Sequence, residues 1–109
     1  MKATFTLKDR IALSNSLPTV GKYDELILRE AVMKKISLSS EDLVTFKVTT
    51  ADNGGMDWDH ECKETWEYEF AANEANYICS QLKKRSNEGN LTIHHMNLYK
   101  TFIDLWQNE

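Results

Sequence analysis

Residues 46–70 have the sequence FKVTTADNGGMDWDHECKETWEYEF, and their side chains alternate between apolar and polar along most of this length. A period of two is typical of strands that have one face in a core and the other in water. The glycine-containing residues 52–55, DNGG, interrupt the alternation where a hairpin would turn. The apolar side chains at even positions are Phe46, Val48, Met56, Trp58, Cys62, Trp66, Tyr68 and Phe70. The pattern predicts a small antiparallel sheet over about residues 46–70.

Three helices are predicted before this sheet. Thr6 is suited to cap the first helix, with Asp9 at its third position, and Pro18 should end it. Residues 23–36 are rich in helix formers, and their apolar side chains spread around the helical wheel. We therefore expect a central helix that is buried on more than one side. Ser39 followed by acidic residues predicts a short third helix.

Two further helices are predicted after the sheet. The first carries a narrow apolar stripe and ends at Gly89. The second has an apolar face that fills half of the helical wheel, formed by Met96, Leu98, Tyr99, Phe102, Ile103, Leu105 and Trp106. We expect this wide face to pack on the inner face of the sheet. The predicted fold class is α+β, a single domain over residues 1–109 with a small antiparallel sheet packed on helices from both the N- and C-terminal segments.

Composition narrows the possible functions. The chain has 109 residues, a formal net charge of −4 and 28% charged residues, which are ordinary values for a globular protein. The negative charge disfavours direct binding to nucleic acid or to an anionic membrane. No apolar run approaches a membrane span or a signal peptide, so a cytoplasmic location is expected. Cys62 and Cys79 are too few for a disulfide scaffold and are expected to be buried, reduced thiols.

The polar side of the predicted sheet is rich in carboxylates. Alternation would align Asp57, Asp59, Glu61, Glu67 and Glu69 on it. Such a row favours binding of a protein partner with a basic surface, although acidic residues also blunt the exposed edge of a sheet without further function. A second hypothesis is a small metal-dependent enzyme or factor centred on Asp57, Asp59 and His60. A third is a structural or regulatory homo-oligomer, because an unpaired strand edge and a wide apolar helix face both favour self-association.

No catalytic motif accompanies these residues. The chain has neither a nucleophile elbow nor a phosphate-binding loop. The candidate ligands for a soft metal are His60, Cys62, Cys79, His94 and His95. They lack the close pairs that zinc sites use, and His95 is expected to be a hydrogen-bonded histidine at the edge of the core. We therefore predict a noncatalytic interaction or accessory protein with no catalytic residue, no metal and no cofactor.

Two parts of the chain outside the predicted sheet resemble a type of small bacteriophage and prophage protein of unknown function. The first part comprises residues 6–13, Leu17-Pro18, Gly21, Lys34-Lys35-Ile36 and Ser39-Ser40-Glu41. The second comprises Glu74, Ile78, Leu82, Gly89, Leu91, Leu98-Tyr99 and Phe102. The resemblance implies a phage-borne accessory protein that acts in the host cytoplasm, and it transfers no catalytic or binding residue.

Overall fold

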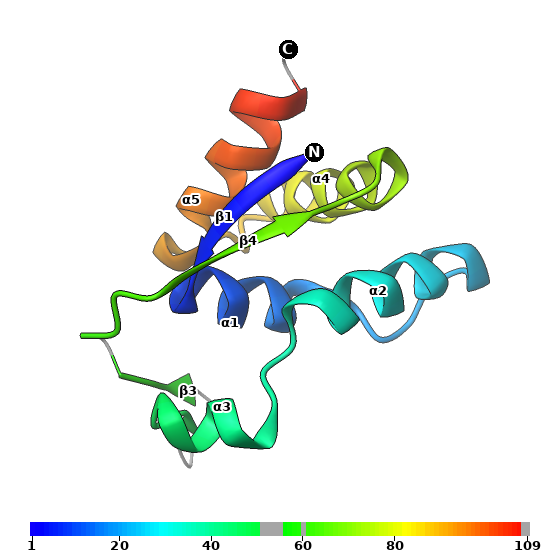
Figure 1. Ribbon diagram of the computed structural model, residues 1–109. Coiled ribbons are helices and arrows are strands. Elements are labelled where there is room, and N and C mark those ends of the chain that lie inside the picture. Colours follow the sequence, from blue (N-terminus) through cyan, green and yellow to red (C-terminus); the bar gives the residue numbers. More distant parts are fainter. Residues whose placement is uncertain (51–55, 60, 108–109) are drawn as a thin grey trace.

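The computed structural model describes residues 1–50, 56–59 and 61–107, and its fold class is α+β (Figure 1). Antiparallel strand pairs are combined with helices that precede and follow them in the sequence. The elements are β1 (Lys2–Thr6), α1 (Leu7–Ser16), α2 (Tyr23–Ile36), α3 (Ser40–Thr45), β2 (Thr49–Thr50), β3 (Met56–Asp57), β4 (Thr65–Glu69), α4 (Ala72–Asn87), the 3₁₀-helix η1 (Ile93–His95), α5 (Met96–Tyr99) and the π-helix η2 (Lys100–Gln107).

The predicted sheet over residues 46–70 is divided between two separate strand pairs. β2 pairs with β3 in a short hairpin, in which Thr50 lies opposite Met56. β4 pairs instead with β1, a strand at the N-terminus that the sequence analysis did not predict. Residues 58, 59 and 61–64 belong to no strand, so the expectation of one sheet through this region is wrong. The predicted turn at residues 52–55 lies outside the described residues.

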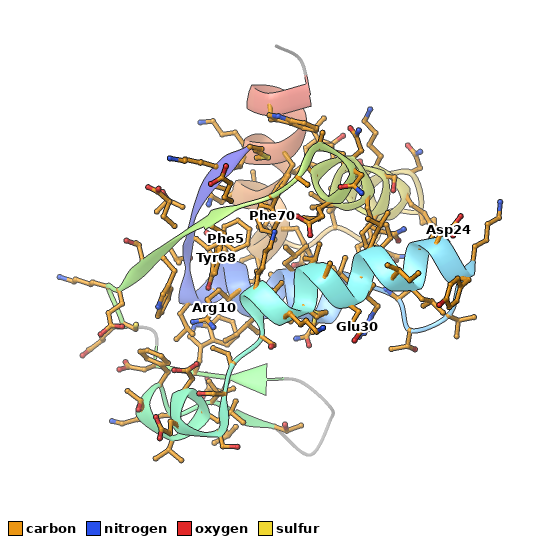
Figure 2. All side chains as sticks on the ribbon, turned by 45° about the vertical axis from the view of Figure 1, so that its right-hand side comes forward. Phe5, Arg10, Asp24, Glu30, Tyr68 and Phe70 are labelled. Carbon is orange, nitrogen blue, oxygen red and sulfur yellow. The ribbon has the colours of Figure 1, made fainter. Side chains whose placement is uncertain are left out.

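The β1–β4 pair forms one side of the main core. Its inner face carries Phe5 opposite Trp66, and its outer face carries Lys2 opposite Glu69. Phe5 is 1% exposed, and its ring contacts those of Tyr68 and Phe102 at centroid distances of 5.3 and 6.1 Å. Figure 2 shows Phe5, Tyr68 and Phe70 gathered beneath the strands. The expected packing of the C-terminal helical segment on the sheet is confirmed, because Phe102 belongs to η2.

A second, smaller core lies below α1. Leu7, Ile11 and Phe46 are its buried members, and the half-buried Trp58 and Trp66 pack against it. The rings of Phe46 and Trp66 meet edge to face at a centroid distance of 5.6 Å. In Figure 1 this region, with α3 and β3, extends beneath the rest of the molecule.

The helix boundaries follow their capping residues. Thr6 and Asp9 form a reciprocal capping box at the start of α1, and Ser39 caps α3 in the same way. α4 ends before Gly89, whose φ of 72° is the left-handed conformation that glycine tolerates at a helix end. These three sequence predictions are confirmed.

α2 has the predicted boundaries but not the predicted burial. Only Val32 and Ile36 among its residues are buried, whereas Tyr23 is 78% and Ile27 48% exposed. The expectation of a central helix buried on several sides is therefore wrong. The physical reason is that its C-terminal half packs against α4 and the strands, while its N-terminal half extends into solvent (Figure 1).

Candidate functional site

The five carboxylates predicted for partner binding lie on two different strand pairs and the segment between them. Glu67 and Glu69 are exposed on the outer face of β4, and Asp57 is exposed in β3. Asp59 is half-buried and Glu61 is exposed, and both belong to the strand-free segment. The five residues do not form the continuous strand row that alternation predicted.

The acidic residues are nevertheless concentrated along one stretch of chain. Residues 57–69, here called the acidic segment, contain six acidic residues and one lysine, a formal charge of −5. The other 96 residues contain 11 acidic and 12 basic residues, a formal charge of +1. In Figure 1 the described part of this segment runs along the left side of the molecule, from β3 to β4. The net negative charge of the protein therefore comes from the acidic segment, because the acidic and basic residues elsewhere nearly balance.

Local hydrogen bonds occupy two carboxylates of the proposed metal centre. Oδ1 of Asp57 accepts from the N–H of Trp58 at 3.0 Å, and Oδ1 of Asp59 accepts from the N–H of Glu61 at 3.0 Å. His60, the third member of that hypothesis, lies outside the described residues. Within the described parts of the chain, no group of three or more His, Cys, Asp or Glu side chains is arranged to hold a metal ion.

His95 is a hydrogen-bonded histidine at the edge of the core, as predicted. Its Nδ1 accepts from the backbone N–H of Thr92 at 3.1 Å, so the ring proton lies on Nε2. Nε2 then donates to Oγ of Ser16 at 2.5 Å, and that hydroxyl donates to the Ala12 carbonyl at 2.5 Å. Burial, with the nearby charges of Arg85 and His94, lowers the pKa of His95 and keeps the ring neutral. A ring that donates to a serine cannot serve as the base that activates it.

The two cysteines are free thiols in different environments. Cys79 is fully buried, and its Sγ donates to the Phe102 carbonyl at 3.3 Å. Burial raises the pKa of this thiol, which disfavours the nucleophilic thiolate. Cys62 is only half-buried, so the expectation of burial is confirmed for Cys79 and is wrong for Cys62.

A pocket of about 330 Å³ lies between α1, α4, η1 and the segment that follows β3. α1 supplies residues 8, 11, 12, 15 and 16, whose spacing places them on one face of the helix. Arg85 enters from α4, Trp58 follows β3, and Thr92, His94 and His95 come from η1 and its N-cap. We call this cavity the α1–η1 pocket.

Contacts of Arg85, Trp58 and His94 position the side chains around the α1–η1 pocket. The Nε and Nη2 atoms of its guanidinium donate to the carbonyls of Ser16 and Asn15, each at 3.4 Å, at the C-terminal end of α1. The rings of Trp58 and His94 meet edge to face, with centroids 5.5 Å apart. From the sequence, His94 was a candidate metal ligand only and His95 a candidate ligand or core-edge histidine, and neither was expected to line a pocket. Its residues are far apart in the sequence and share no motif, so no sequence signal was present to identify it.

Comparisons with protein-family models, curated proteins and solved structures found no match to this chain. Over the described residues, no helix has the length and apolar character required to cross a bilayer.

Proposed function

We propose that this chain is a noncatalytic interaction protein that binds a basic protein surface through its acidic segment. The observation that carries the proposal is the concentration of charge: residues 57–69 have a formal charge of −5, whereas the remaining residues sum to +1. Complementary charge increases the rate of encounter and selects partners of the opposite sign. The resemblance to bacteriophage proteins supports a phage or prophage origin and a partner in the host cytoplasm.

Exposure of the carboxylates supports binding through this segment. Asp57, Glu61, Glu67 and Glu69 are exposed, so a partner can reach them without any change in the fold. Lys2 lies opposite Glu69 on the sheet and offsets part of its charge. Glu67, by contrast, lies opposite the neutral Thr4.

The first test compares two double substitutions of equal charge. Glu67→Gln/Glu69→Gln removes two exposed carboxylates of β4, and Asp24→Asn/Glu30→Gln removes two from α2, where Figure 2 shows them well away from β4. Tagged proteins would be used to capture partners from a bacterial lysate at low and at moderate salt. We expect the β4 variant to lose the captured partner and the α2 variant to retain it. Equal retention by both would contradict a role for the acidic segment.

A second test distinguishes another copy of the chain from a different partner. Light scattering over a concentration series measures the mass of the isolated protein. A constant monomer mass is expected if the partner is a different protein. A mass that rises with concentration, and that Glu67→Gln/Glu69→Gln reduces, would instead favour the homo-oligomer.

A further inference from the structure

The α1–η1 pocket is cationic within an otherwise acidic protein. Lys8 and Arg85 line it, and no described lining residue is a carboxylate, although the chain has 17 acidic residues. Neither Lys8 nor Arg85 forms an ion pair with another described residue. The positive charge of this pocket is therefore uncompensated by the described side chains.

Arg85 is held in a position from which it can still bind a ligand. Its two bonds to the α1 carbonyls offset the partial negative charge at that helix end and fix the guanidinium. They use two of its five N–H donors, which leaves three for an anionic oxygen. A fixed guanidinium fork matches the geometry of carboxylate and phosphate groups.

The rest of the pocket suits a flat apolar body. Ile11, Ala12 and the Trp58 ring provide apolar surface beside the two cations. The volume of about 330 Å³ falls at the lower end of the range for small-molecule sites, roughly 300–1,000 Å³. We propose that the α1–η1 pocket binds a small organic anion, with its carboxylate or phosphate group at Arg85 and Lys8 and its ring against Trp58.

The test uses matched anionic and neutral probes in NMR titrations of the ¹⁵N-labelled full chain. Benzoate is compared with benzamide for the carboxylate arm, and phenyl phosphate with phenol for the phosphate arm. The indole N–H of Trp58 and the Nε–H of Arg85 report binding. We expect at least one anion to shift both signals and to bind roughly tenfold or more tightly than its neutral counterpart, in accord with charge-assisted hydrogen bonds. If neither anion is preferred, the proposal is wrong.

Two variants of equal charge locate the binding site. Lys8→Gln should weaken binding of the preferred anion about two- to fivefold, as expected for an exposed charge. Lys83→Gln, an exposed cation on α4 that does not line the pocket, should leave affinity unchanged. Because Lys8 is exposed, its substitution should not impair folding, which the chemical-shift pattern verifies. Equal losses in both variants would indicate general charge attraction and overturn the proposed site.

Discussion

Arg10 is 5% exposed, and its guanidinium connects α1 to the end of α2 and to β4. Its Nε and Nη2 donate to the carbonyls of Ile36 and Ser37 at 3.0 Å each, at the end of α2. The guanidinium also lies over the Trp66 ring, 4.6 Å from its centroid. Figure 2 shows Arg10 at the junction between the main body and the α3 region. A single side chain thus connects the two cores.

We expect Arg10→Lys to destabilise the protein by about 2–4 kcal/mol, because lysine retains the charge but loses the planar fork and the stacked geometry. Urea denaturation measures the change. Arg29→Lys is the matched control, since the buried Nε of Arg29 has no partner among the described residues, and should cost less than about 1 kcal/mol. A similar loss in the free energy of unfolding for Arg10→Lys and Arg29→Lys would contradict the connecting role of Arg10.

His95 should make the folded state sensitive to mild acid. Its pKa in the folded protein lies below the ordinary value of 6.5, so the unfolded chain binds a proton first as pH falls. Through this one proton, stability should level off toward pH 7.5 and decrease as pH falls through 6.5, by at most about 1.4 kcal/mol per pH unit. Denaturation between pH 5.5 and 7.5 measures the slope and avoids the titration of carboxylates such as Glu74. The slope should vanish in His95→Gln, and its persistence there would assign it to another group.

At the scale of elements, two helix ends have the same left-handed geometry but different residues. Gly89 has a φ of 72° after α4, and Lys47 has a φ of 54° after α3. A Cβ at position 89 would meet no atom within 4 Å, so only the backbone conformation opposes a side chain there. We expect Gly89→Ala to destabilise the fold by about 1 kcal/mol and Lys47→Gly to stabilise it by about 0.5–1 kcal/mol. Thermal denaturation measures both, and effects of the same sign would contradict this explanation.

The helices were predictable because their signals are local. Capping at Thr6 and Ser39, the break before Pro18 and the Gly89 terminus depend on residues within one or two helical turns. β1 was missed because Lys2–Thr6 carries only five residues of alternation, and its partners on β4 lie 59 to 67 positions away, from Thr6↔Thr65 to Lys2↔Glu69. Alternation identified which face of β4 points inward, but it could not identify the partner strand.

At the scale of the whole molecule, the two cores predict two units of local stability. Phe46 is 7% exposed and belongs to the smaller core, whereas Leu82 is fully buried in the main core. We expect Phe46→Ala to increase hydrogen exchange mainly in α3 and the β2–β3 hairpin, with little change in α4. Leu82→Ala should increase exchange in both regions, because the smaller core packs on α1 and depends on the main body. If Phe46→Ala increases hydrogen exchange equally in α3, the β2–β3 hairpin and α4, the two cores form one cooperative unit.

Local signals in the amino-acid sequence established the fold class, the helices before and after the sheet and the concentration of acidic residues, because propensity, capping and charge are properties of neighbouring residues. Three features became visible in the folded chain alone: β4 pairs with β1, α2 lies at the surface, and Lys8, Trp58, Arg85 and His94 line one pocket. These features depend on contacts between residues far apart in the chain. Such contacts are selected by packing of the whole molecule and leave no periodic pattern in the sequence.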